Sequence, residues 1–498
     1  MTVKFYFTLL LCVLLTACSQ ASVPSLRFGL ADAPVNLDPR FATDATSSRI
    51  NRLIYQALVS FDQHYAPTPE LATWEQITLS HYRLHLGETG RIFHDGSHLQ
   101  AEDVKATYDF ILDPRNASPH RTSLAHIQAI QVIDANTLEF HLAKPDALFI
   151  GRLTIGIVPA KLIAQHYPFN KQPLGSGTFK FVQWQQSSHL ILQRIVDGLQ
   201  VEFLEVKDPL VRTLKLVHGE LDLLQNDLSP ELIVWLSQQP QLQVEKREGT
   251  NFAYIGLNLE DSVTSNLLVR QAISYAINRD EIIHYVLGDA AHPANSLLPT
   301  AHWARHQNLP AYTYHPEKAK ELLTQAGFSG TLHLTYKTTN NPLRLRLATV
   351  IQHQLAEVGI RAELRSYDWG TFYGDIKTGN FQMFSLAWIG IKLPDIFRYA
   401  FHSDAFPPKG ANRGRFKDAR VDELIEKAEL APTLEAQAAF YRELQQRLFE
   451  QLPCIPLWYE DLVAVTQRWI SGYQLAADGN YDGLNTIQFA GSKRYNLL

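Results

Sequence analysis

The chain has 498 residues, of which 46% are hydrophobic and 19% are charged, a balance typical of a folded globular protein. Its length exceeds that of a single ordinary core, so two or three subdomains are expected. Fifty acidic and forty-five basic residues leave a net charge of −5, and the absence of a basic block disfavours nucleic-acid binding.

The N-terminal segment predicts export. Lys4 precedes an apolar run over 5–15, too short for a membrane span of ~20 residues and typical of a secretory signal. Leu15-Thr-Ala-Cys18 resembles a lipoprotein box, in which Cys18 receives diacylglycerol and becomes the first residue. A plain signal peptide with a chance cysteine is the alternative. On the lipoprotein reading, residues 1–17 are the signal peptide and 18–25 a tether, Cys454 is the remaining thiol, and no disulfide is expected.

Hydrophobic periodicity predicts strands and helices that alternate along the chain. The predicted strands are 26–30, 77–86, 136–142, 180–183, 254–259, 331–336, 361–367 and 462–466; the predicted helices are 50–61, 101–112, 268–279, 315–325, 343–358, 419–430 and 434–452. Strand, helix and strand over 331–367 predict a parallel crossover. The glycine-rich stretch 175–179 lacks the spacing of a phosphate-binding loop and predicts a turn.

A set of motifs carries a family resemblance. The central one is Tyr254-Ile-Gly-Leu-Asn258 followed by Val269-Arg-Gln-Ala-Ile-Ser-Tyr-Ala-Ile-Asn-Arg279. Leu37-Asp-Pro39 and the stretch 93–104 precede it, and Arg420-Val-Asp-Glu-Leu-Ile425 and Leu452-Pro-Cys-Ile-Pro-Leu457 follow. In this order they resemble the bacterial family 5 extracellular solute-binding proteins, which include peptide- and nickel-binding components of ABC importers.

The resemblance implies an α/β, periplasmic-binding-protein-like fold with two lobes and an additional small α+β domain. It places domain I at 26–60, 165–250 and 462–498, domain II at 61–164, and domain III at 251–461. The chain is expected to be a monomer.

The ligand site is expected to combine aromatic walls with a few polar anchors. The aromatic candidates are Tyr254, Tyr367, Trp369, Trp388 and Tyr399, and the candidate anchors for anionic groups are Arg270, Arg398 and Arg413. Trp388 leads, because the resemblance implies that its side chain faces the cavity.

The chain departs from the family near Trp388. Peptide binders of the family often carry a carboxylate three residues further on to grip the peptide's α-amino group, but here that position is Ile391, followed by Lys392. Gln382 stands where the family usually has Asp, and Asp395 is a possible substitute for the missing carboxylate. Burying an ammonium without a counter-charge is costly. We therefore hypothesise a ligand that lacks this amine or is held in another register.

Catalysis and metal binding are weakly supported. His94 and His98 bracket a glycine turn instead of sharing a helix face, while His81 and His85 share a strand face and are expected to be solvated. No GxSxG elbow is present, and Cys454 lies beside proline and apolar residues, a poor setting for a thiolate. The sequence predicts no catalytic residue, metal or cofactor.

The sequence therefore predicts a lipid-anchored binding protein in the periplasm or cell envelope. It would deliver a peptide-like or other small solute to an ABC permease and its ATPase. Two alternatives are an exported hydrolase of peptides or cell-wall fragments, and a haem or metal-chelate carrier on the same fold.

Overall fold

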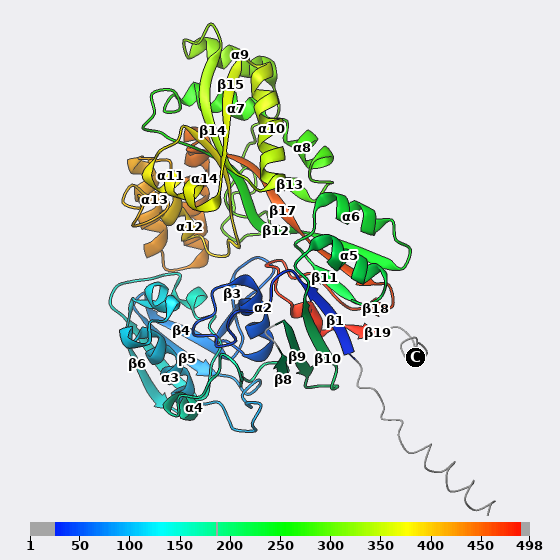
Figure 1. Ribbon diagram of the computed structural model, residues 1–498. Coiled ribbons are helices and arrows are strands. Elements are labelled where there is room, and N and C mark those ends of the chain that lie inside the picture. Colours follow the sequence, from blue (N-terminus) through cyan, green and yellow to red (C-terminus); the bar gives the residue numbers. More distant parts are fainter. Residues whose placement is uncertain (1–24, 186–187, 490–498) are drawn as a thin grey trace, which may run out of the picture.

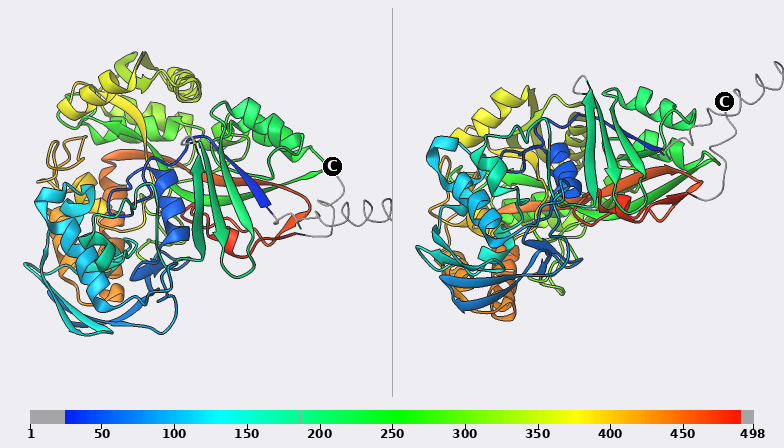
Figure 2. Two further views of the ribbon diagram at one scale, coloured as in Figure 1. Left: turned by 60° about the horizontal axis from the view of Figure 1, so that its bottom comes forward. Right: turned by 90° about the horizontal axis from the view of Figure 1, so that it is seen from below.

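Two long antiparallel strands, β12 (Leu242–Leu257) and β17 (Cys454–Gln467), run together from one half of the molecule into the other (Figures 1 and 2). The computed structural model describes residues 25–185 and 188–489. Glu248 pairs with Asp461 and Asn251 pairs with Glu460, so Gly249 and Thr250 form a bulge between the halves. A Cβ atom on Gly249 would lie 2.5 Å from the carbonyl oxygen of Glu460, so the bulge requires glycine at that position.

One large sheet extends through both halves. Its strand order is β15-β14-β16-β12-β17-β11-β1-β10-β9-β8, with β13 paired to β17. The strands not yet bounded are β15 (Ile360–Tyr367), β14 (Leu332–Thr339), β16 (Met383–Trp388), β11 (Leu223–Gln225), β1 (Ser25–Leu30), β10 (Gln200–Glu205), β9 (His189–Arg194), β8 (Phe179–Gln185) and β13 (Ala291–Pro293). The half containing β1 and β8–β11 is called the first lobe, and the half containing β14–β16 the second lobe.

A separate four-stranded antiparallel sheet belongs to the first lobe, at the lower left of Figure 1. Its order is β4 (Ala72–Thr78), β5 (His81–Leu86), β7 (Thr137–Leu142) and β6 (Ile127–Asp134). Helix α3 (Ala101–Leu112) shares a buried apolar cluster with one face of this sheet. Two short pairs, β2 (Val59–Phe61) with β3 (Pro67–Pro69) and β18 (Ile470–Ser471) with β19 (Gln488–Phe489), complete the strands of the described chain.

The remaining helices pack on these sheets (Figure 1). Those of the first lobe are α2 (Ala45–Ile54), α4 (Ala160–Ala164), α5 (Pro209–Val217) and α6 (Pro230–Ser237). Those of the second lobe are α7 (Leu267–Ala276), α8 (Arg279–Tyr285), α9 (Pro316–Gln325), α10 (Pro342–Glu357), α11 (Trp369–Thr378), α12 (Ile396–Phe401), α13 (Ala419–Leu430) and α14 (Leu434–Gln451). Within the described ranges, no helix combines the length and apolar character needed to cross a bilayer.

The expected apolar stripe of the central helix is buried, with Val269, Ala272, Ile273 and Ala276 all inaccessible to solvent. The helix is shorter than predicted, however. It ends at Ala276, because the Asn278 side chain accepts a hydrogen bond from Glu281 N and starts the separate helix α8.

Four other predicted elements are wrong in extent. The helix expected over 50–61 ends at Ile54, whose carbonyl accepts a hydrogen bond from Gly177 N instead of continuing the helix ladder. The strand expected over 77–86 comprises the end of β4, a turn and β5. Alternation of polar and apolar residues does not reveal where the chain reverses direction. The strands expected over 254–259 and 462–466 are parts of the longer β12 and β17. The parallel pairing of β14 with β15 around α10 is confirmed.

Candidate functional site

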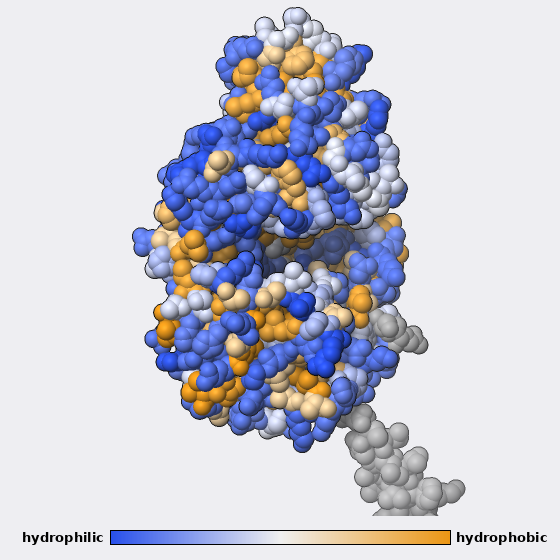
Figure 3. Space-filling view, turned by 90° about the vertical axis from the view of Figure 1, so that its left-hand side faces the viewer, coloured by the Kyte–Doolittle hydropathy of each residue, from blue (hydrophilic) through white to orange (hydrophobic). Residues whose placement is uncertain are grey.

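A hollow runs across the middle of the molecule between the two lobes (Figure 3). It contains a cavity of about 820 Å³, lined by the start of α2 and Asp478 from the first lobe and by Ile389 and Gly390 from the second. A second cavity of about 370 Å³ is lined by Lys392 and by residues of α2 and the adjacent loops. These volumes fall within the range of small-molecule binding sites. We call the two cavities together the cleft.

Most of the charged side chains on the wall of the larger cavity are acidic. Seven carboxylates line it against two guanidinium groups: Asp32, Asp44, Glu205, Asp227, Glu460, Asp461 and Asp478 against Arg49 and Arg344. Arg344 is already paired with Glu460 at 2.6 Å, and burial raises the pKa of Asp227 and Asp461. The excess of acids gives the cleft a negative potential that favours a cationic ligand group.

A loop of the second lobe reaches across the cleft after Trp388. Lys392 Nζ forms an ion pair of 2.8 Å with Asp478 of the first lobe. Burial opposes ionisation of Asp478, but the attraction of Lys392 prevails and lowers the pKa of that carboxyl group. The same loop forms a second bridge, in which Arg152 of the first lobe donates to Asp395 at 2.9 Å. Both carboxylates are therefore engaged by protein cations.

His302 holds the Lys392 loop from behind. Its Nδ1 accepts a hydrogen bond from Ala304 N at 3.0 Å, so Nε2 carries the proton and donates to the Lys392 carbonyl oxygen at 3.1 Å. The ring also stacks on Tyr65 of the first lobe, with centroids 5.7 Å apart. His302 is fully buried, and burial lowers its pKa to about 4, which keeps the imidazole neutral at physiological pH.

Four of the predicted site residues form one cluster in the second lobe, which we call the aromatic pocket: Tyr254, Trp388, Tyr399 and Arg413; Tyr254 and Arg413 are buried, whereas Tyr399 is 47% exposed. Arg413 donates to Tyr254 Oη at 2.9 Å, and its guanidinium carbon lies 4.4 Å from the Trp388 ring centroid. Trp388 stacks on Tyr254 and meets the Tyr399 ring edge-on. The open space lined by Tyr254, Trp388 and Arg413 is only about 30 Å³.

Arg413 is 8% exposed and has no carboxylate within ion-pairing distance in the described part of the chain. Aromatic faces and two tyrosine hydroxyls surround it instead. Cation–π attraction offsets part of the cost of burying the charge.

Residues 66–406 match the family described as bacterial extracellular solute-binding proteins, family 5 (middle). The chain belongs to this family. It is 26% identical to the dipeptide-binding protein of Escherichia coli K12, across 93% of this chain and 94% of that protein.

Two solved structures of similar proteins cover nearly the whole chain. HbpA2 from Haemophilus parasuis has a TM-score of 0.84 at 24% identity, covering 93% of this chain and 99% of that one. The ABC transporter-associated periplasmic binding protein DppA from Helicobacter pylori, in complex with the peptide STSA, has a TM-score of 0.73 at 26% identity, covering 94% and 98%. The predicted two-lobed, periplasmic-binding-protein-like α/β fold is confirmed, and this family 5 member is a solute-binding protein.

The other predicted site residues of this family 5 protein lie apart from the aromatic pocket. Trp369 is 56% exposed and stacks on Tyr373. Tyr367 lies beside Lys337, whose Nζ is 5.5 Å from its ring centroid. Arg398 pairs with Glu429 at 2.7 Å and Asp404 at 3.1 Å. Their roles in ligand binding stay predictions.

The predicted role of Arg270 has to be corrected. It is 4% exposed and donates to the carbonyl oxygens of Leu452, Gln451, Thr264 and Ser265, so it fixes the turn before α7 to the end of α14. The prediction that it anchors an anionic ligand group is wrong.

The structure also clarifies the positions where this chain departs from other family members. Ile391 is buried in an apolar cluster with Phe397 and Phe401. Gln382 accepts hydrogen bonds from Thr335 N and Oγ1 and donates to Asp261, so it connects β14 to the loop after β12. Neither supplies a charge to a ligand.

Sequence reasoning missed the first-lobe wall of the cleft, including Asp478 and the residues at the start of α2. The signal available was Asp44, a typical helix N-cap residue ahead of the apolar run. Nothing local marks Asp478, because its partner Lys392 is 86 positions away.

Proposed function

We propose that this protein is the lipid-anchored receptor of an ABC importer and that it captures a peptide-like solute in the cleft. The observation that carries the proposal is a cavity of about 820 Å³ with walls from both lobes. The dipeptide-binding protein of E. coli and the peptide complex of the H. pylori protein support the ligand class.

Binding is coupled to lobe closure in this proposal. A solute that touches both walls binds the closed arrangement more tightly than the open one, and only this difference in affinity shifts the population. The closed form then presents both lobes to the permease. The carrier releases its solute chemically unchanged, so a panel of peptides incubated with the protein should show no new masses, whereas a hydrolase would shorten them.

We propose further that the ligand carries a positive charge held by the first lobe. Ile391, three residues after Trp388, is buried and carries no charge, while acids outnumber bases on the cleft wall. In this proposal the cationic group is held in a different register from the one that the family resemblance implies.

Calorimetry with three matched tripeptides tests the charge preference: Ala-Lys-Ala, Ala-Gln-Ala and Ala-Glu-Ala. We expect the lysine peptide to bind at least ~10-fold more tightly than the glutamate peptide, with a difference that shrinks as salt is added. Small-angle X-ray scattering on the same samples should show contraction with the lysine peptide. Equal or tighter binding of the glutamate peptide would overturn the charge assignment, and no contraction with any peptide would overturn closure.

Attachment to the membrane through Cys18 is part of the proposal, although Cys18 lies outside the described residues. Metabolic labelling with a tagged fatty acid should label the expressed protein, and Cys18→Ser should remove the label. A protein that stays unlabelled and is released from the cells as a soluble species would contradict the anchor.

A further inference from the structure

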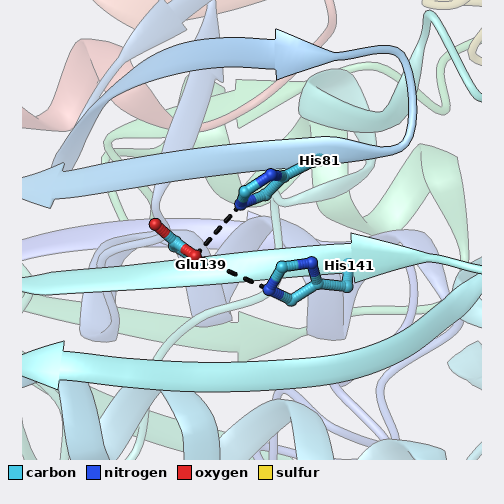
Figure 4. Close-up of side chains that lie close together, drawn as sticks. All are labelled: His81, Glu139 and His141. Atoms are coloured by element: carbon cyan, nitrogen blue, oxygen red, sulfur yellow. Dashed lines mark hydrogen bonds and ion pairs between the residues drawn. The ribbon is translucent and has the colours of Figure 1, made fainter.

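Two histidines and a glutamate meet on the four-stranded sheet of the first lobe (Figure 4). His81 on β5 is directly opposite His141 on β7, and Glu139 lies two residues before His141 on the same face of the sheet. The alternating residues Tyr82, Leu84, Leu138 and Phe140 belong to the buried cluster shared with α3. The histidine face is therefore the one turned away from that cluster. We propose that His81, Glu139 and His141 form a binding site for a divalent transition-metal ion.

The spacing of the three ligand atoms suits one shared ion. Glu139 Oε2 lies 3.0 Å from His81 Nε2 and 3.6 Å from His141 Nε2, and all three atoms are within 4.8 Å of one another. Neighbouring ligands around a tetrahedral zinc ion with bonds of about 2.0–2.1 Å are separated by about 3.3 Å. The imidazole rings are stacked at 4.3 Å, and rotation about χ2, which is soft for histidine, turns both Nε2 atoms toward one point.

Arg83 orients the Glu139 carboxylate without occupying the proposed metal site. Its guanidinium contacts Glu139 Oε1, at 2.8 Å from Nε and 2.7 Å from Nη2. These two contacts hold the Glu139 carboxylate in one orientation. Oε2 remains the atom shared with the two histidines, and a metal ion would replace those two contacts.

The donor set selects the class of ion. Two imidazole nitrogens and one carboxylate oxygen suit zinc, nickel or copper, whereas calcium and magnesium prefer oxygen ligands alone. His81 and His141 side chains are 26% and 35% exposed, so an ion can enter from solvent and keep a water in its open position.

This site is separate from solute capture. None of the three residues lines either cavity of the cleft. The proposal therefore does not depend on the identity of the transported solute.

Titration with Co²⁺, a coloured substitute for Zn²⁺, tests the site in protein purified without a polyhistidine tag. We expect one equivalent to produce a visible d–d absorption band and one equivalent of Zn²⁺ to remove it. His81→Gln and His141→Gln should each weaken Zn²⁺ binding at least ~10-fold in calorimetry. Both positions are partly exposed, so the variants should keep the parent's circular dichroism and unfolding temperature without metal.

His85→Gln is the matched control. His85 lies on the same strand face but contacts Thr137 rather than Glu139, so this variant should bind Co²⁺ and Zn²⁺ as the parent does. The proposal is overturned if the parent shows no stoichiometric binding, if binding survives in both the His81 and His141 variants, or if the His85 variant loses it equally. Binding of the lysine tripeptide should be the same in all three variants.

Discussion

The aromatic pocket and the cleft differ in size and in charge. The pocket encloses about 30 Å³ around the buried guanidinium of Arg413, whereas the larger cavity of the cleft holds about 820 Å³ and carries more carboxylates than guanidinium groups on its wall. In sequence, aromatic residues with an arginine look like a ligand site, and scattered acids look like solvated surface. The difference teaches that two regions whose residues look alike in sequence can differ greatly in free volume, which no motif encodes.

The largest effect is expected when a side chain of the aromatic pocket is truncated. Tyr254 is 5% exposed, stacks on Phe252 and Trp388, and accepts the Arg413 hydrogen bond. Tyr254→Ala should lower the free energy of unfolding by about 3–5 kcal/mol in urea denaturation, as for other large aromatic truncations. Tyr254→Phe should lose only about 1–2 kcal/mol, because packing remains and one acceptor is lost. Peptide affinity of the Phe variant should match the parent; a large loss would make the pocket part of the ligand site.

Next in size is a pH effect at His302, behind the cleft wall. Because burial lowers its pKa to about 4, the unfolded chain binds more protons than the folded chain between pH 6.5 and 4. Stability should therefore fall as pH falls through that window, by about 3 kcal/mol in total. His302→Gln keeps one acceptor for Ala304 N and one donor for Lys392 O but does not titrate. Its stability profile should be flatter by that amount; identical profiles would contradict the assignment.

Substituting the two partners of the ion pair across the cleft should change the affinity for the ligand in opposite directions. Asp478→Asn should weaken binding of the lysine tripeptide by about 10-fold, because Lys392 then faces the cleft as an unpaired cation that repels the ligand's positive charge. Lys392→Met should strengthen it, because Asp478 is then free to meet the ligand. Calorimetry on both variants measures the two changes. If both substitutions move the affinity in the same direction, Asp478 is not the ligand's counter-charge.

The smallest effect is expected at Arg398, which belongs to neither region. Its side chain is 32% exposed and pairs with Glu429 and Asp404. Arg398→Ala should cost at most about 1 kcal/mol of stability, as for other surface ion pairs, and leave tripeptide affinity unchanged. A loss of affinity beyond ~5-fold would restore Arg398 as a ligand anchor.

The order of elements was largely readable from sequence, because apolar periodicity over 101–112 or 419–430 is a local property that helices α3 and α13 keep. The extent of β12 was not readable. All of residues 243–248 except Val244 are polar or charged, and they form a strand because they pair with 461–466 of β17, more than 200 positions away.

The candidate sites were less predictable for the same reason. The family resemblance identified Trp388 and its neighbours as candidates. It did not indicate that the Arg270 guanidinium donates hydrogen bonds to four carbonyl oxygens. His81 and His141 lie 60 positions apart, and only the register of β5 with β7 makes them neighbours. Residues that meet through strand pairing or across two lobes leave no mark in local spacing.

The bulge at Gly249 and Thr250 has a geometric consequence for solute transfer. The two lobes are connected by strands that are hydrogen-bonded to each other on both sides of the bulge, so neither connection can lengthen or slide alone. Rotation is then confined to an axis near Thr250 and Asn251, which themselves line the cavity. For a given rotation of the lobes, groups at the rim of the cavity move furthest. The contacts of a long ligand that reaches the rim therefore change more on closure than those of a short ligand bound near the axis.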